Sequence, residues 1–386
     1  MQAVRDRAKI AYSNRRKELV AAMEKTTIKD VAALAGVSIA TVSRVVHGQE
    51  SVAPEYVQKV HDAMAQLNWR PNSIAQKLRS ERTRTIGVIL PNTIDPFFGS
   101  IADSIICSCA EQSLNVMTLI SRKGSVYDEV TQFRRLADAG VDGAIYCSIS
   151  KPDTEAFERY CANIPVVVCS RHDLFKGRTH VYFNHQKGGY LATKHLLEMG
   201  HRRIALIVGV FGNNFKCAED LQPYLDKPVL AGPFSGIDKY IGARMALDEF
   251  GVNFDPELLE FIDLGNAYED GYSAMQRLLS KTTDIDAVFC SNDLSANGAI
   301  RMLTQQRINV PEDVSVMGYD NGIMATCTRP QLSTVVQDTE KLGIECVRCM
   351  KKLLNHEPCA DVEIDVQLII RQSSCRKKSK SADVRY

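Results

Sequence analysis

Residues 27–78 decide the fold of this chain, with the sequence TIKDVAALAGVSIATVSRVVHGQESVAPEYVQKVHDAMAQLNWRPNSIAQKL. Apolar residues recur at helical spacing through its first turns. Thr27 and Asp30, three residues apart, are close to the pattern of a capping box. Gly36 then interrupts the helix. The pattern predicts a short capped helix that ends in a glycine turn.

Two further helices are predicted in the same stretch. Ser38 is placed to cap the second, whose Val42 and Val45 face inward. The third runs from about Pro54 to Leu67, and its proline suits a first turn. Three short helices around a small apolar core occur both in DNA-binding domains and in plain structural caps.

Two strings within this stretch are more specific. AGVSIATVSRVVHG, residues 35–48, resembles the helix-turn-helix of the lactose-repressor (LacI/GalR-type) family of bacterial transcription regulators. NWRPNSIAQKL, residues 68–78, resembles the hinge helix of that family. The resemblance extends, with interruptions, from about residue 26 to 370. It implies an all-α helix-turn-helix DNA-binding head with a hinge helix, followed by an α/β two-lobe periplasmic-binding-protein-like effector domain with parallel sheets and three crossovers.

The resemblance and the composition together predict the domain organisation. We expect a disordered N-terminal extension at 1–25, the DNA-binding domain at 26–71, the hinge helix and linker at 72–84, the two-lobe effector-binding and dimerisation domain at 85–370, and a disordered basic tail at 371–386. Met23 opens MEKTTIKDVAALAG in the manner of a natural start, so translation from Met23 is an alternative to an N-terminal extension.

The second helix is the predicted reader of DNA, because the start of a recognition helix meets base edges. Arg44 is suited to bidentate recognition of a guanine, whereas Ile39 and Ala40 read thymine methyl groups or shape. The resemblance places Leu78 where the family inserts a leucine into the minor groove; the alternative is a plain linker whose leucine packs on the core. The predicted DNA contacts are Thr27, Ser38, Ile39, Ala40, Thr41, Ser43, Arg44, His47, Asn72, Ala75 and Leu78.

The charge distribution agrees with a DNA-binding end. The 386 residues carry a net charge of +1. Residues 1–85 hold 15 Lys and Arg against 8 Asp and Glu, residues 86–370 hold 26 against 37, and residues 371–386 hold 6 against 1. A basic head on an acidic body confines attraction for phosphate to one end of the chain.

Beyond Thr85, short β-rich runs alternate with amphipathic stretches. IGVIL, NVMTLIS, GAIYC and PVVVC are followed by RIALIV, FIDL, AVFCS and VSVMGY, with helices between them. This alternation predicts parallel sheets built from βαβ units. Ligands of such sheets bind beyond the carboxyl ends of the strands. About 285 residues of the pattern exceed one ordinary sheet domain, which predicts two lobes.

Polar and aromatic residues occupy positions that face the effector in the family. The predicted effector contacts are Asp95, Phe97, Arg171, Lys239, Asn292, Asp293 and Gln337. Their chemistry suits a polyhydroxylated, sugar-like small molecule. For Asp293, the cap of the following helix is the competing role.

Three departures from the family pattern weaken a sugar assignment. Lys239 stands where the family usually has an arginine, and lysine cannot form paired, fork-like hydrogen bonds. Asn266 stands where an aromatic residue is usual. Residues 213–238 are longer than the usual loop. The effector is therefore either unusual or absent.

Several other classes of protein are not expected. No apolar run approaches the roughly 18 residues that span a membrane, and the N-terminus is not a secretory signal. The 12 cysteines are scattered and are expected to be reduced thiols of a cytoplasmic protein. Cys346 and Cys349 form a lone CxxC that helical periodicity explains. No P-loop, HExxH or GxSxG pattern occurs, so neither an enzyme, a metal site nor a cofactor is expected.

The resulting hypothesis is a transcription regulator, most simply a repressor, that binds double-stranded operator DNA as a homodimer and responds to a small-molecule effector. The tail lacks a leucine heptad, so a dimer is favoured over a tetramer. One alternative is a small-molecule receptor with a vestigial DNA head. Another is an enzyme on the same two-lobe fold. The sequence leaves the effector, the operator and the choice between induction and co-repression open.

Overall fold

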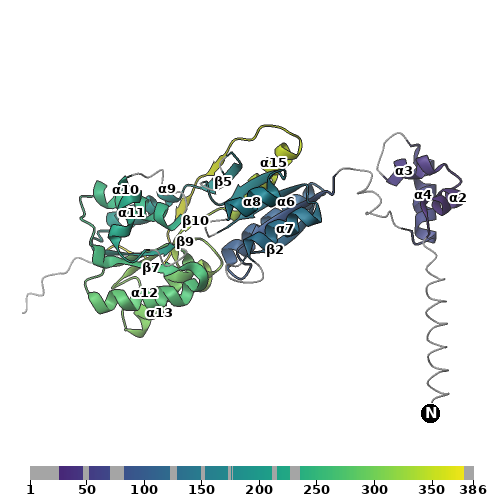
Figure 1. Ribbon diagram of the computed structural model, residues 1–386. Helices are drawn as coiled ribbons and strands as arrows, with labels where there is room; N and C mark the ends of the chain where they lie inside the picture. Colours follow the sequence, from purple (N-terminus) through teal and green to yellow (C-terminus); the bar gives the residue numbers. More distant parts are fainter. Residues whose placement is uncertain are drawn as a thin grey trace, which may run out of the picture. The chain divides into compact units, whose positions relative to one another are not determined.

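The computed structural model describes residues 26–46, 52–69, 82–121, 128–148, 153–172, 175, 177–210, 215–226 and 235–377. Two compact units make up the chain: a head, Met1–Arg82, and a body, Thr83–Tyr386. The head is helical, and the body contains all the labelled strands (Figure 1). No helix within the described ranges is both long and apolar enough to cross a membrane.

The head forms the three predicted helices, α2 (Ile28–Ala35), α3 (Ile39–Val46) and α4 (Pro54–Gln66). Val31, Val42 and Val60, one from each helix, are fully buried and form the centre of its core. The capping box is confirmed, because the Thr27 N–H donates to Asp30 Oδ2 over 2.7 Å.

The turn between the first two helices also follows the sequence. Gly36 adopts the left-handed conformation with φ of 65°, where a side chain is unfavourable. Ser38 then starts α3, since its Oγ accepts a hydrogen bond from the Thr41 N–H over 3.0 Å. These two short interactions set the angle at which α3 leaves α2.

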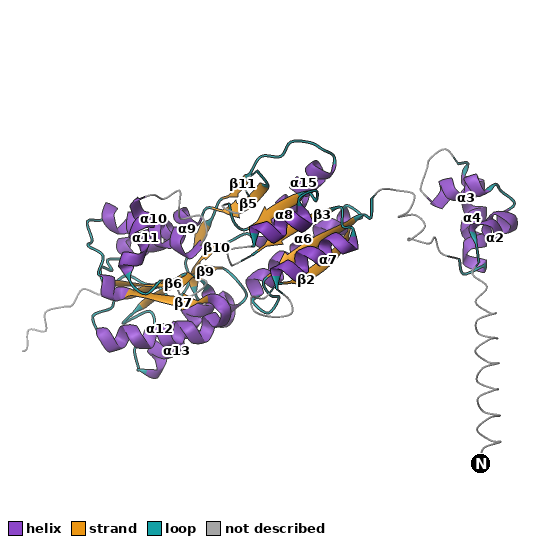
Figure 2. Cartoon of the chain, viewed as in Figure 1, coloured by secondary structure: helices purple, strands orange, loops and turns teal. Residues whose placement is uncertain are grey.

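The body contains two six-stranded sheets, and Figure 2 shows their strands between layers of helices. Sheet A has the order β11-β5-β4-β3-β1-β2 and sheet B the order β12-β10-β9-β8-β6-β7. Neighbouring strands are parallel except for β12, which is antiparallel to β10. The strands of sheet A are β1 (Thr85–Leu90), β2 (Asn115–Ile120), β3 (Gly143–Cys147), β4 (Val166–Cys169), β5 (Thr179–Phe183) and β11 (Val362–Ile364). Those of sheet B are β6 (Ile204–Val210), β7 (Leu259–Asp263), β8 (Ala287–Cys290), β9 (Ser315–Asp320), β10 (Ser333–Val336) and β12 (Gln367–Ile369).

Helices cover both faces of each sheet. The helices on sheet A are α6 (Pro96–Glu111), α7 (Glu129–Ala139), α8 (Thr154–Cys161) and α15 (Thr339–Leu354). Those of the other lobe are α9 (His185–Glu198), α10 (Gln222–Asp226), α11 (Ser235–Glu249), α12 (Ala267–Lys281), α13 (Asp293–Gln305) and α14 (Met324–Cys327). In Figure 1, α9 and α11 lie on one side of sheet B, and α12 and α13 lie on the other. The two sheets with their helices are the two predicted lobes, called lobe A and lobe B below.

The chain passes between the lobes three times. The crossovers lie between β5 and α9, between β10 and α15, and between β11 and β12. This is the number that the family resemblance implies. The crossovers are short, so they keep the two lobes close together.

Reciprocal glycines bring the paired helices of lobe B together. A Cβ on Gly189 of α9 would lie 1.9 Å from the carbonyl oxygen of Lys239, and one on Gly242 of α11 would lie 1.9 Å from that of Gln186. Gly271 and Gly298 make the equivalent close approach between α12 and α13. A backbone that packs this closely fixes the main chain of Lys239.

The predicted disorder from Arg371 onward is wrong for Arg371–Lys377. The Val316 N–H donates to the carbonyl oxygen of Ser373 over 2.7 Å, and Ser373 Oγ accepts from the Ser333 N–H over 2.8 Å. Serine hydroxyls therefore satisfy backbone groups beside sheet B. Composition predicts solvation for such a polar segment, but these hydrogen bonds hold it against the lobe.

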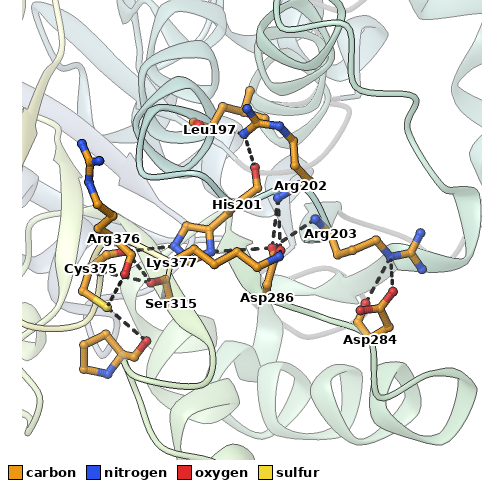
Figure 3. A network of polar contacts seen from close by, with 11 residues as sticks. Leu197, His201, Arg202, Arg203, Asp284, Asp286, Ser315, Cys375, Arg376 and Lys377 are labelled. Atoms are coloured by element: carbon orange, nitrogen blue, oxygen red, sulfur yellow. Dashed lines mark hydrogen bonds and ion pairs between the residues drawn. The ribbon is translucent and has the colours of Figure 1, made fainter. Parts of the chain in front are cut away.

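The end of this segment joins a polar network around Asp286 (Figure 3). The Asp286 carboxylate accepts from the N–H groups of Arg202, over 3.2 Å, and Arg203, over 3.0 Å, and forms an ion pair with Lys377. His201 Nδ1 lies 3.6 Å away, at ion-pair rather than hydrogen-bond distance. Burial opposes ionisation of Asp286, but the contacts with His201, Lys377 and Arg202 outweigh it and hold its pKa well below the usual range.

Candidate functional site

The candidate nucleic-acid interface is the outer face of α3. Ile39 is 44% exposed, and Ala40 and Arg44 are exposed beside it, while Val42 and Val45 on the opposite face are buried. The helical period of α3 therefore directs the predicted base-reading residues to solvent.

Three of the predicted DNA contacts also serve the head itself. Ser38 Oγ lies 2.9 Å from Thr41 Oγ1, and the Thr27 hydroxyl donates to Asp30 Oδ2 over 2.7 Å. Ser43 is partly buried. The predicted contacts His47, Asn72, Ala75 and Leu78 lie outside the described residues.

The candidate effector site is built around Lys239 in α11, of which 6% is exposed. Its Nζ donates to the carbonyl oxygen of Ser291 over 2.8 Å and lies 3.8 Å from the centre of the Tyr319 ring. Burial lowers the pKa of Lys239 to about 8, although Asp320 and Asp293 favour its charged form. The lysine thus makes one carbonyl contact and one cation–π contact where arginine would offer a fork.

Asp293 is the first residue of α13 and is buried. Its Oδ1 accepts from the Thr334 hydroxyl over 2.6 Å and its Oδ2 from the Gly322 N–H over 2.8 Å. Burial raises the pKa of Asp293 to about 7. The helix cap is Asn292, whose Oδ1 accepts from the Ser295 N–H over 2.7 Å. The capping role that competed for Asp293 therefore belongs to its neighbour.

Asp320 and Gln337 form a hydrogen-bonded pair in the site. Gln337 was predicted from the sequence, whereas Asp320 was not. Gln337 Nε2 donates to Asp320 Oδ1 over 2.5 Å. Gln337 is 5% exposed, and its Oε1 has no hydrogen-bond partner among the described residues. Asp320 is the last residue of β9, and Asp293 lies shortly after β8, so the rule that ligands bind at strand ends would also have pointed to Asp320.

Asp95 and Phe97 supply the part of the site that belongs to lobe A. Asp95 caps α6 by accepting from the Phe97 N–H over 3.0 Å. Burial raises the pKa of Asp95, and Lys239 of the other lobe opposes this change. The Phe97 ring packs against Phe98 and Phe183, with centroid distances of 5.2 and 6.5 Å.

Arg171 is also buried, at the carboxyl ends of β3 and β4. Its charge favours ionisation of Tyr146 and Cys147, although burial outweighs it for Tyr146. Sequence reasoning missed His185, whose Nδ1 lies 3.3 Å from the Tyr319 hydroxyl. Burial holds the pKa of His185 well below its usual value, so this imidazole is neutral at pH 7.

The structure therefore joins Asp95, Lys239, Asp293, Asp320 and Gln337 in one polar site between the lobes. Within the described ranges, no cluster of three or more His, Cys, Asp or Glu is arranged to hold a metal ion. The donors and acceptors are those of a site for a small polar molecule.

Comparison with known proteins places both units. Residues 27–72 match the bacterial regulatory proteins of the lacI family. Residues 83–217 match the periplasmic binding proteins and sugar binding domain of LacI family, and residues 235–374 a periplasmic binding protein-like domain. The HTH-type transcriptional repressor PurR of Haemophilus influenzae (strain PittEE) is 33% identical, over 90% of this chain and 98% of PurR. The chain belongs to the LacI family.

Solved structures of similar proteins share this architecture. The lac repressor dimer bound to operator and the anti-inducer ONPF has a TM-score of 0.76 at 26% identity, over 91% of this chain and 99% of that one. The transcriptional regulator CelR in complex with cellobiose has a TM-score of 0.63 at 28% identity, over 91% and 100%. As a LacI-family member, the protein is a DNA-binding transcription regulator with a two-lobe effector-binding body. The alternative of a receptor with a vestigial head is not favoured.

Proposed function

We propose that this regulator is a cytoplasmic repressor that binds a near-palindromic operator as a homodimer and is controlled by a sugar-like effector between its lobes. The observation that carries the proposal is the capped three-helix head, which presents the exposed face of α3 above a buried valine core. The lac repressor and CelR, which share the fold, are complexes with operator and with cellobiose, respectively. We also propose that the protein has no enzymatic activity.

Arg44 is the proposed principal base reader, through a bidentate contact with guanine. Ile39 and Ala40 offer only apolar contacts and therefore read thymine methyl groups or groove shape. The residues proposed to contact the sugar-phosphate backbone of the DNA are Thr27, Ser38, Thr41, Ser43, His47 and Asn72. Ala75 and Leu78 are assigned to the minor groove, where Leu78 opens a base step.

The proposed effector contacts differ in how free their side chains are. Asp95 and Gln337 retain acceptor atoms for a ligand, and Phe97 offers an apolar ring. Both oxygens of Asp293 already accept protein hydrogen bonds, so its contact with a ligand uses the remaining lone pairs. Among the remaining proposed contacts, Arg171 follows β4 and Asn292 follows β8, while Lys239 lies in α11 and reaches the Ser291 carbonyl beyond β8.

Effector binding controls DNA binding only through a difference in affinity for two states of the body. Three crossovers connect the lobes, and acidic residues lie between them. Effector binding is therefore expected to change the angle between the lobes. A change in this angle alters the separation of the paired hinges in the dimer. We assign the hinge to residues 72–84 and the effector domain to 85–370.

Selection of bound fragments from genomic DNA, followed by fluorescence anisotropy with the recovered operator, tests the proposal. Arg44→Ala is expected to weaken operator binding by about 1–3 kcal/mol and to relax specificity at one base pair. The control Arg159→Ala removes an exposed arginine of α8 and should leave binding unchanged. Recovery of no enriched fragment, or equal losses in the two variants, contradicts the proposal.

A further inference from the structure

Four aspartates lie near one lysine, Lys239, between the lobes. The carboxylates of Asp95, Asp238, Asp293 and Asp320 all act on the buried ammonium group of Lys239. Burial raises the pKa of Asp95, Asp293 and Asp320, even though Lys239 opposes the change at Asp95 and Asp320 and Arg371 opposes it at Asp293. Burial therefore disfavours the ionised form of these carboxyl groups more than Lys239 and Arg371 favour it, and a further positive charge at the site would stabilise the ionised form.

The ammonium group of Lys239 is held in a fixed position and cannot move to pair with each carboxylate. Its Nζ is fixed by the Ser291 carbonyl at 2.8 Å and by the Tyr319 ring at 3.8 Å from its centre. Its main chain is packed against Gly189, with no room for a Cβ between them. The ammonium therefore contributes a fixed charge at one side of the site.

Two of the carboxyl groups belong to different lobes and are close enough to influence each other's ionisation. Asp95 belongs to the start of α6 in lobe A and Asp320 to the end of β9 in lobe B, and both are partly exposed. The charge of Asp95 raises the pKa of Asp320, so the two groups repel when both are ionised. Each accepts one hydrogen bond within the described part of the chain, from the Phe97 N–H and from Gln337 Nε2. The second oxygen of each carboxyl group accepts no hydrogen bond from the described residues.

The buried amide oxygen of Gln337 is a second, independent indication of a ligand. Its amide nitrogen is bonded to Asp320, and its Oε1 is buried without a donor among the described residues. A buried acceptor without a donor costs free energy that a ligand N–H recovers. The site therefore favours a ligand that brings hydrogen-bond donors and positive charge to the same place.

We propose that the effector is a sugar derivative with a protonated amine, held between the Asp95 and Asp320 carboxylates and donating to Gln337 Oε1. The inference rests on the proposed effector site and specifies its ligand class. A cation between the two carboxylates replaces repulsion between the lobes by attraction to a shared charge. Amine binding and lobe closure are thereby coupled.

The first test needs no ligand. Thermal unfolding of the full chain at pH 7.5 compares Asp95→Asn and Asp320→Asn with wild type. Each change removes a carboxyl group whose ionised form burial disfavours and keeps an acceptor oxygen, and asparagine also caps helices. We expect each variant to unfold about 2–4 °C higher than wild type. The matched control Asp286→Asn removes a compensated carboxylate and should unfold at a lower temperature. Lower unfolding temperatures for the Asp95 and Asp320 variants overturn the inference.

The second test measures ligand charge directly. Isothermal titration calorimetry compares D-glucosamine, D-glucose and D-glucose 6-phosphate as probes of the full chain. We expect D-glucosamine to bind at least about tenfold more tightly than the other two, and this preference to disappear in Asp320→Asn. Equal binding, no binding of any probe, or preference for the neutral or anionic probe overturns the inference.

The outcomes separate this inference from the proposed function. If glucose or glucose 6-phosphate binds best and changes operator affinity, the charge assignment fails while the effector-controlled regulator stands. If the protein binds no genomic fragment, the proposed function itself fails, whatever the calorimetry shows.

Discussion

The contribution of a single buried side chain to the stability of this protein depends on how many hydrogen bonds and ion pairs it completes. Asp286 is the clearest case, because it joins two backbone N–H groups, Lys377 and the neighbourhood of His201. Its position before β8 places it at the opposite end of the sheet from the candidate effector site. We therefore assign it to stability rather than to ligand binding.

Asp286→Asn is expected to lower the free energy of unfolding by about 3 kcal/mol, since it removes a buried charge and leaves Lys377 without its partner. The folded pKa is lowered, so the carboxylate stabilises above the unfolded value of about 4 and loses this contribution as pH falls below it. Urea unfolding of both proteins between pH 2 and 7 measures the difference. A gap that does not narrow below pH 4 contradicts this role.

Sequence alone indicated part of the candidate site at this scale. The resemblance to the family pointed to Asp95, Asp293 and Gln337, because these residues match family positions that face the effector. Asp320 was missed, although it ends a strand. The pairing of Asp320 with Gln337 depends on two residues 17 positions apart meeting across a turn and a strand, which a local pattern does not reveal.

At the scale of elements, close helix contacts position the chemistry. The approach of α9 to α11 holds Lys239 in place through glycines on both helices. These glycines have no special backbone conformation, so their value lies in the missing side chain. The paired helices α12 and α13 use the same device.

Gly242→Ala is expected to destabilise the protein by about 3 kcal/mol, because the added Cβ would lie 1.9 Å from a carbonyl oxygen and 2.7 Å from the Tyr190 nitrogen. Backbone atoms cannot move aside as a flexible side chain does. Gly99→Ala is the matched control, since its Cβ would make an ordinary contact of 3.5 Å. Chemical unfolding measures both, and an equal effect of the two substitutions contradicts the packing argument.

The elements that sequence predicted are those with strong local patterns. The three head helices and the strands β1 to β4 and β6 to β9 fall where apolar runs and caps place them. The short strands β5, β10, β11 and β12 were missed, because β5 mixes polar with apolar residues and the other three have only three or four residues each. The order of the segment Arg371–Lys377 was also missed, since it depends on hydrogen bonds to distant strands.

At the scale of the whole molecule, charge separates the two tasks. Residues 1–85 hold 15 basic against 8 acidic residues, whereas residues 86–370 hold 26 against 37. The basic head attracts DNA phosphates, and the acidic body does not compete for them. Aspartates also outnumber lysine in the site between the lobes, where the proposed ligand is cationic.

The salt dependence of binding to the selected operator tests the central claim most directly. Fluorescence anisotropy between 50 and 200 mM KCl measures the affinity of the full chain for the operator and for a scrambled duplex. We predict that operator affinity falls by roughly 10³-fold over this range and, at each salt concentration, exceeds affinity for the scrambled duplex by at least roughly 10³-fold. An operator affinity that is insensitive to salt, or no greater than that for the scrambled duplex, contradicts the account.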